Sequence, residues 1–259
     1  MPCISQFFGV IIYMYHNDHL PSHFHAEYGE FEAVYDIETT TDLQRVYMVG
    51  YYDGNQYRFW ETKPLPPTDE HSALALFLEW YFSNPRDEWL YAHNGGNFDN
   101  VFTLSWLLSQ PTERFRAEVI PVQSCMLRLR VTRTESPKTY YDFLDSFRLL
   151  PASLNALAET FLGRGKVDID NDYENLMRNP KRYEYLEADC KLLYDVIIMF
   201  RGKLQQEMGG TLSLSTAACA LKTFQQGFQK KMLHSGTPES DRISRDAYYG
   251  GRCEIFRKS

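Results

Sequence analysis

Cysteine, long hydrophobic runs and positive charge are all scarce in this sequence of 259 residues. The five cysteines are an odd number, are widely scattered and include no C-x-x-C pair, which argues against a disulfide framework or a zinc finger. The longest apolar run, FFGVIIYMY at 7–15, is far shorter than the ~20 residues of a membrane-spanning helix. No signal peptide is recognisable, so we expect a cytoplasmic protein with no membrane partner.

The formal net charge of −7 argues against a protein that coats nucleic acid by electrostatic attraction alone. It does not exclude an enzyme that acts on a strand end, because a carboxylate-rich metal site lowers the net charge while basic residues gather elsewhere. Such gathering is present, since residues 111–140 carry six Arg or Lys against three acids. Length and composition, with 44% apolar residues, are typical of one large globular domain, with or without a small appendage.

Apolar patterning alternates between the periods of strands and helices. It predicts a strand at 33–38, a hairpin at 44–60 with its turn at Asp53-Gly54-Asn55, and a helix at 70–83. Further along it predicts a strand at 88–93, a helix from about 98 to 109, two strands at 115–133 and 138–147, and helices at 152–162 and 180–201. This order predicts an α/β sheet with helices on both faces.

The first 33 residues differ from the rest, because they hold four of the seven histidines: His16, His19, His23 and His25. A zinc site is one interpretation, and a solvated loop followed by an alternating strand is the other. The first 39 residues resemble the start of a small bacterial domain of unknown function. A hairpin of that domain would compete for the backbone of the strand that begins at Val34, and we expect the larger sheet to prevail from Val34 onwards.

Three short motifs carry the functional argument. In the first, Asp36-Ile37-Glu38, strand alternation places both carboxylates on one face. Adjacent like charges are costly unless a cation lies between them, although for this motif taken alone an exposed strand end is the better explanation. The second, YAHNGGNFD at 91–99, leads from a buried strand through glycines to Asp99 at a helix start, where α/β sheets commonly bind ligands. A plain turn followed by an acid in the first helical turn is its alternative.

In the third motif, Tyr185 and Asp189 lie four residues apart on one face of the long helix. That face also carries Leu192, Leu193 and Val196, so Asp189 is expected to point to the core and to need a partner, for which a metal ion is suitable. A solvated acid on an acidic helix is the alternative.

Taken together and in this order, the motifs resemble those of the 3′→5′ exonuclease domain of DNA polymerases, across about residues 34–251. Shorter elements are similar to the protein-primed branch of family B: Ser153-Leu154 in SLNAL, Lys166 in KVDI, and Tyr248, Gly250 and Gly251 in YYGG. The resemblance implies a ribonuclease-H-like (DnaQ-like) α/β fold, a mixed sheet flanked by helices, with a short N-terminal β extension.

The resemblance also implies a two-metal hydrolysis. Its carboxylates, Asp36, Glu38, Asp99 and Asp189, would hold two Mg²⁺ or Mn²⁺ ions. Tyr185 would orient water and Lys166 would neutralise phosphate charge. The 3′ end of single-stranded DNA would contact Asn94, Phe98, Ser153 and Leu154, with Tyr91, His93, Thr39, Tyr248, Gly250 and Gly251 as further candidates.

This comparison divides the chain into a β extension at 1–33, an exonuclease domain at 34–235, and a linker at 236–259 that ends before a polymerase palm. The motifs S-L-Y-P and D-T-D-S of such a palm are absent from the sequence. We therefore expect a bacterial, phage- or plasmid-encoded chain that is a natural fragment, a separately encoded subunit or a truncated relic of such a polymerase. A polymerase module or terminal protein encoded elsewhere is a candidate partner. The alternatives are a catalytically silent DNA-binding or interaction module, and an unrelated α/β protein with chance motifs.

Overall fold

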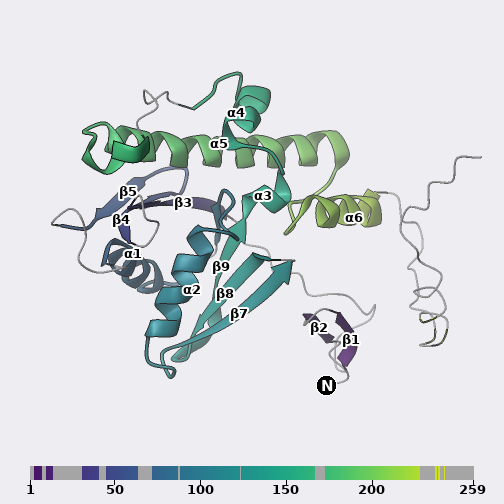
Figure 1. The fold of residues 1–259 in the computed structure, drawn as a ribbon. Helices are drawn as coiled ribbons and strands as arrows, with labels where there is room; N and C mark the ends of the chain where they lie inside the picture. The colour runs from purple at the N-terminus through teal and green to yellow at the C-terminus, as the bar shows by residue number, and fades with distance from the viewer. Residues whose placement is uncertain are drawn as a thin grey trace, which may run out of the picture.

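A computed structural model describes residues 3–7, 10–13, 31–40, 45–63, 72–86, 88–122, 124–166 and 173–227, together with Thr237, Glu239 and Arg242. Its main feature is a seven-stranded mixed sheet with helices on both faces (Figure 1). The predicted α/β class is therefore confirmed. Among the described residues, no helix combines the length and apolar character that crossing a membrane requires.

The strands follow one another across the sheet in the order β5-β4-β3-β6-β9-β8-β7. At the centre, β3 (Phe31–Thr39), β6 (Glu88–Ala92) and β9 (Ser136–Asp145) run parallel. The outer strands β4 (Val46–Tyr52), β5 (Tyr57–Glu61), β7 (Phe115–Val122) and β8 (Cys125–Arg133) are antiparallel to their neighbours. The carboxyl ends of the three central strands consequently meet at one edge of the sheet.

The strand that carries the first motif belongs to this sheet over its whole length. β3 pairs with β6 over Phe31–Val34 and with β4 over Val34–Thr39, so only Val34 has ladder partners on both sides, and pairing in the large sheet begins earlier than the predicted Val34. Near the N-terminus, β1 (Cys3–Phe7) and β2 (Val10–Tyr13) form a separate antiparallel pair. The N-terminal hairpin expected to compete for β3, around Gly29-Glu30, and the four N-terminal histidines lie outside the described residues.

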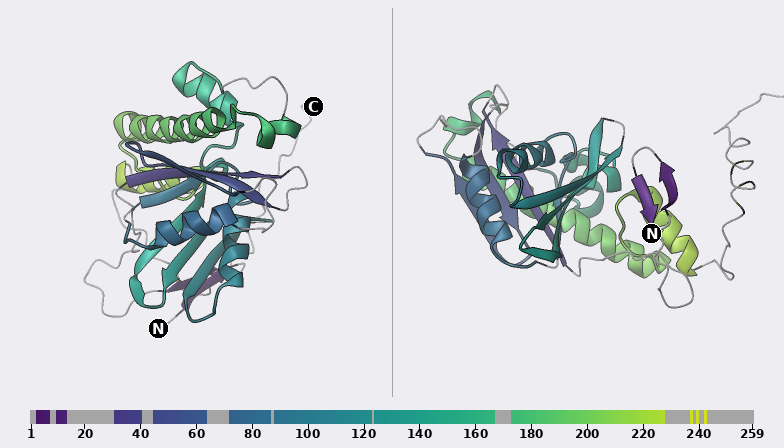
Figure 2. Two further views of the ribbon diagram at one scale, coloured as in Figure 1. Left: turned by 90° about the vertical axis from the view of Figure 1, so that its left-hand side faces the viewer. Right: turned by 90° about the horizontal axis from the view of Figure 1, so that it is seen from below.

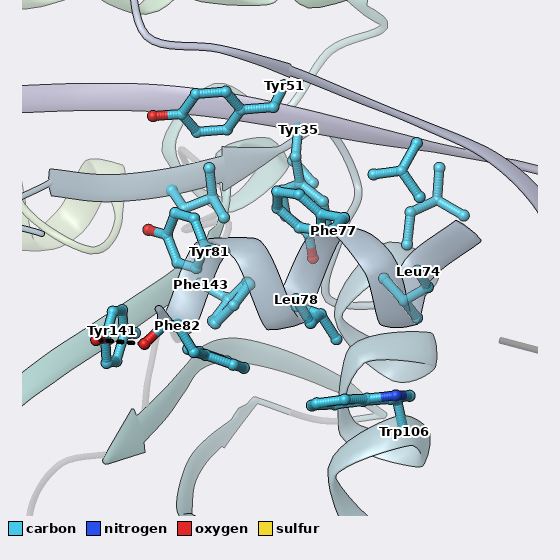
Figure 3. Packing of buried hydrophobic residues seen from close by; sticks show 14 of the residues in the cluster. Tyr35, Tyr51, Leu74, Phe77, Leu78, Tyr81, Phe82, Trp106, Tyr141 and Phe143 are labelled. Carbon is cyan, nitrogen blue, oxygen red and sulfur yellow. Dashed lines mark hydrogen bonds between the residues drawn. The ribbon is translucent and has the colours of Figure 1, made fainter. Parts of the chain in front are cut away.

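One face of the sheet is covered by α1 (Ser72–Phe82) and α2 (Asp99–Ser109). This core is rich in aromatic rings, and the ring of Tyr35 stacks on that of Phe77 at 5.7 Å while Phe143 meets Tyr35 edge-on (Figure 3). The opposite face is covered by α4 (Leu154–Leu162) and by the long α5 (Arg182–Met208), which the views in Figure 2 show lying across the sheet.

The predicted boundaries are wrong in three places. Residues 115–133 form two strands, β7 and β8, because the chain reverses after Val122 and pairs with itself. The long helix continues past residue 201 to Met208 and ends at Gly209, whose φ of 62° suits glycine. The pattern also gave no sign of three short helices: α3 (Ser146–Leu149), η1 (Tyr173–Arg178) and α6 (Thr216–Gly227).

Candidate active site

Asp36 and Glu38 extend from β3 towards α5. Their neighbours Tyr35 and Ile37 pack in the core on the α1 and α2 side, so strand alternation places both carboxylates on the other face, as predicted. Burial and the negative charge of Asp189 raise the pKa of Asp36 to about 7, although the ammonium group of Lys166 opposes this shift. Burial, followed by the charge of Asp36, raises the pKa of Glu38 well above its usual value.

Asp99, the first residue of α2, is buried beside the same strand. Its Oδ1 accepts the backbone N–H of Ile37 at 2.9 Å, three residues beyond Val34, the last residue of β3 that pairs with β6. Asp99 thus provides a hydrogen-bond acceptor for β3 in the part of the strand that no longer pairs with β6. Burial, followed by the charge of Asp36, raises the pKa of Asp99 well above its usual value.

Tyr185 and Asp189 lie on the buried face of α5, again as predicted. The Nζ of Lys166 lies 2.5 Å from Oδ2 of Asp189 and 3.3 Å from the hydroxyl of Tyr185. Oδ1 of Asp189 is buried without a hydrogen-bond partner in the described part of the chain. Lys166 therefore compensates the charge of Asp189 at Oδ2 only, and Oδ1 is left without a hydrogen-bond partner among the described residues.

The structure brings the four predicted carboxylates into electrostatic contact. Burial, and after it the charges of Asp36, Asp189 and Asp99, raise the pKa of Glu38. Gly50 makes this approach possible. It pairs with Asp36, and a Cβ added to it would lie 2.8 Å from both Sγ of Cys190 and Cγ of Leu186 on α5. Any larger residue would hold α5 away from β3.

The donor set fits Mg²⁺ or Mn²⁺ in its chemistry, because all four groups offer oxygen and three have raised pKa values that a cation would lower. The uncompensated Oδ1 of Asp189 points to the same conclusion. Among the described residues, however, no three His, Cys, Asp or Glu side chains lie close enough to bind one ion together. Ion binding would therefore require these side chains to draw together.

The loop between β6 and α2 carries the second motif. Asn94 is exposed and adopts a φ of 61°, and its Oδ1 accepts a hydrogen bond of 2.7 Å from Nδ2 of Asn97. The half-buried ring of Phe98 meets Phe102 edge-on at 5.2 Å. Nδ1 of His93 lies 3.1 Å from Oγ of Ser146. Asn94, Phe98 and His93 are thus placed on one loop beside Asp99.

Of three predicted DNA contacts, Tyr91 and Leu154 are buried and Ser153 is exposed at the start of a helix. The side chain of Tyr91 is 1% exposed and packs in the core beneath α5, because its position in β6 faces that layer. Leu154 is also a core residue, and Ser153 caps α4 by accepting the N–H of Ala156. Their pattern is explained by helix formation. Thr39 is half-buried at the end of β3, while Tyr248, Gly250 and Gly251 lie outside the described residues.

The sequence argument missed Ser146 and Phe147, which follow the end of β9. The hydroxyl of Ser146 contacts His93 and the carbonyl of Ala92, and the ring of Phe147 meets His93 edge-on at 5.8 Å. A serine and an aromatic residue directly after a strand of the central sheet were the available signal. Only the parallel pairing of β6 with β9 places them beside the loop.

Comparison with known proteins shows similarity to DNA polymerases. A family model described as DNA polymerase type B, organellar and viral, matches residues 165–259, which include Lys166, Tyr185 and Asp189. The DNA-directed DNA polymerase of Enterobacteria phage PRD1 is 26% identical over 87% of this chain and 35% of its own length. The chain is thus similar to the type B model in its C-terminal part and to a phage DNA polymerase over most of its length. A probable DNA polymerase of Ascobolus immersus is 22% identical over 73% of this chain and 19% of its own length.

Among solved structures, phi29 DNA polymerase complexed with single-stranded DNA has a TM-score of 0.63 at 19% identity, and covers 85% of this chain and 40% of its own. A ternary complex of phi29 DNA polymerase with primer-template DNA and nucleotides has a TM-score of 0.64, also at 19% identity. This likeness confirms the ribonuclease-H-like fold. The chain spans about a third, or less, of the curated type B polymerases that it matches.

The N-terminal resemblance is confirmed as well. A model of a domain of unknown function (DUF4160) matches residues 9–48. The match extends beyond Thr39, where the resemblance was expected to fade, and includes Asp36 and Glu38. The match to this domain model and the Asp36-Ile37-Glu38 motif therefore overlap on β3.

Proposed function

We propose that this chain is the 3′→5′ exonuclease part of a type B DNA polymerase of the protein-primed branch, and that it hydrolyses 3′-terminal nucleotides of single-stranded DNA. The observation that carries the proposal is that Asp36 and Glu38 lie on the face of β3 that packs against α5, whose buried side carries Asp189. A protein without a cation-dependent reaction gains nothing from carboxylates whose charges oppose one another so strongly.

Asp36, Glu38, Asp99 and Asp189 would hold two divalent cations, which when bound supply charge stabilisation for an in-line displacement at phosphorus. Tyr185 lies beside Asp189 and Lys166, where its hydroxyl would orient the attacking water. Lys166 would neutralise charge on the scissile phosphate. Asn94, His93 and Phe98, on the loop before Asp99, would hold the strand end, with the ring of Phe98 stacked on a base.

In this proposal the exonuclease domain comprises residues 34–235, the β extension precedes it, and residues 236–259 lead towards a polymerase module. The protein would act in the cytoplasm with that module or with a terminal protein. A catalytically silent DNA-binding module is the second candidate. It is favoured by the absence, among the described residues, of three side chains already placed to hold one ion.

The test is cleavage of single-stranded oligonucleotides labelled at either end, with Mg²⁺ or Mn²⁺ and with EDTA. We expect metal-dependent loss of nucleotides from the 3′ end and no cleavage by the Asp36→Ala, Glu38→Ala double variant. Asp195→Asn is the control, because Asp195 lies on α5 but pairs with Arg164 at the surface. Single-strand binding without cleavage by the parent protein would favour the silent module, and unchanged cleavage by the double variant would contradict the assigned metal site.

A further inference from the structure

A fifth acidic residue lies at the same edge of the sheet and has no role in the proposed reaction. Asp145 is the last residue of β9, and its side chain is completely buried. Its Oδ1 accepts the N–H of Phe147 at 3.0 Å and so caps α3. Its Oδ2 has no hydrogen bond of ordinary geometry within the described part of the protein. Capping a four-residue helix uses only one oxygen of a costly buried carboxylate.

The second oxygen faces the loop that carries the second motif. Asp145 pairs with Ala92 across the parallel strands, directly before this loop begins. A Cβ added to Gly96 would lie 2.9 Å from Oδ2 of Asp145 and 2.0 Å from the carbonyl oxygen of Met126. The N–H of Met126 also donates to the carbonyl of Gly96 at 3.0 Å. The loop is therefore held between β8 and β9, with no space for a side chain at Gly96.

The charges around Asp145 are consistent with this arrangement. Burial raises the pKa of Asp145, and the N–H of Phe147, the guanidinium of Arg148 and the N–H groups of Gly96 and Asn94 oppose the shift. Arg148 lies 3.9 Å from Oδ2. The carboxylate thus lies against Gly96 in the loop in which Asn94 has a positive φ.

We propose that Asp145 is a positioning residue for DNA binding, because its carboxylate fixes the loop 94–98 in the conformation that presents Asn94 and Phe98 to the strand end. The inference rests on the proposed function, since it assumes that this loop contacts single-stranded DNA. It predicts an effect on DNA affinity that the capping of α3 does not explain. It also predicts that metal affinity stays unchanged, because Asp145 acts through the loop and not as a metal ligand.

Two substitutions separate the roles of the carboxylate. Asp145→Asn replaces one acceptor oxygen by a donor that faces the loop amides. Asp145→Ser keeps a short acceptor for the cap of α3, since serine is a favoured N-cap residue, but does not reach the loop. Asp142→Asn is the matched control, because Asp142 is a buried carboxylate on the same strand that pairs with Arg130, away from the loop.

The measurements are fluorescence anisotropy with a labelled single-stranded oligonucleotide in EDTA, Mn²⁺ titration without DNA, and thermal unfolding. We expect both Asp145 variants to bind the oligonucleotide about ten-fold more weakly than the parent, the loss of roughly one base contact. Their Mn²⁺ affinity should stay within about two-fold of the parent, and Asp142→Asn should lower the melting temperature without changing DNA affinity. If Asp145→Asn does not fold, Asp145→Ser carries the test.

Parental DNA affinity in a folded Asp145 variant would overturn the inference, and so would an equal loss of DNA and Mn²⁺ affinity, which would place Asp145 in the metal site. An Asp142→Asn variant that loses DNA affinity to the same extent would overturn it too, since any buried carboxylate would then suffice. Failure of the parent protein to bind single-stranded DNA would contradict the proposed function itself, so the two failures are distinguishable.

Discussion

The hydroxyl of Tyr35 lies 2.5 Å from Oδ1 of Asn100, so one hydrogen bond joins the residue before Asp36 to the residue after Asp99. Both side chains are fully buried. The N–H of Ile37 donates to Asp99 two residues further along the same strand. These two contacts fix the start of α2 against β3 and thereby fix the separation of two of the proposed metal ligands.

Removing this hydroxyl should destabilise the protein. Tyr35→Phe leaves the amide of Asn100 buried without its partner, and we expect the free energy of unfolding to fall by about 1–3 kcal/mol. Tyr91→Phe is the control, since Tyr91 is equally buried but its hydroxyl has no hydrogen-bond partner among the described residues. Thermal or denaturant unfolding of both variants is the measurement. Equal losses of unfolding free energy in the two variants would show that the Tyr35–Asn100 hydrogen bond contributes no more to stability than an unpaired buried hydroxyl.

Gly50 is expected to be intolerant of even one methyl group. Gly50→Ala places a carbon 2.8 Å from atoms of Cys190 and Leu186, so α5 must move away from β3 or the core must strain, at a cost of about 1–3 kcal/mol. The shift should also weaken Mn²⁺ binding, because Asp189 moves with α5. Gly202→Ala on the same helix meets nothing within 4 Å and should stabilise the protein by roughly 0.5–1 kcal/mol. Calorimetric Mn²⁺ titration and melting curves of the two variants decide the matter.

Lys166 should have opposite effects on metal binding and on cleavage. Its ammonium group lies 2.5 Å from Oδ2 of Asp189, where it competes with a divalent ion for the same oxygen. Lys166→Met should therefore bind Mn²⁺ more tightly while it cleaves DNA more slowly, because phosphate charge is no longer neutralised. Arg164→Met removes a cation that pairs with the exposed Asp195 and should change neither property. Weaker Mn²⁺ binding by the Lys166 variant would contradict the proposed competition.

His93 is expected to make stability depend on pH. Burial lowers the pKa of His93 below its ordinary value of 6.5, so the unfolded chain binds a proton at a higher pH than the folded protein does. The free energy of unfolding therefore decreases as the pH falls below 6.5, because protonation of His93 favours the unfolded state. The melting temperature of the parent, relative to that of His93→Gln, should therefore fall as the pH is lowered from 7.5 to 5.5. A difference that stays constant would show that His93 does not titrate in this way.

Phe98 should contribute to DNA affinity more than to stability. Its ring is half-buried one residue before Asp99, and stacking of a base on an aromatic ring is worth about 1–3 kcal/mol without base preference. Phe98→Ala should weaken single-strand binding about ten-fold or more with Mn²⁺ affinity intact. Phe102→Ala, which removes the neighbouring ring that packs against the core, should instead lower the melting temperature. A large stability loss with parental DNA affinity in the Phe98 variant would remove it from the site.

The sequence alone determined the local part of this protein. Alternation placed Asp36 and Glu38 on one face of a strand, and helical spacing placed Tyr185 with Asp189, because both periods follow from backbone geometry within a few residues. The order of these motifs was enough to predict the fold. Phe98 and Asp99 were likewise placed correctly at the start of a helix.

Tertiary structure decided everything that depends on which segments become neighbours. Tyr91 belongs to the motif by sequence, yet the layer above β6 buries it, and Ser153 matches a short pattern that merely caps a helix. Ser146 and Asp145 reach the loop only because β9 pairs with β6. Such pairings join residues more than fifty positions apart, and their choice depends on the burial of whole faces of the sheet, which no local pattern encodes.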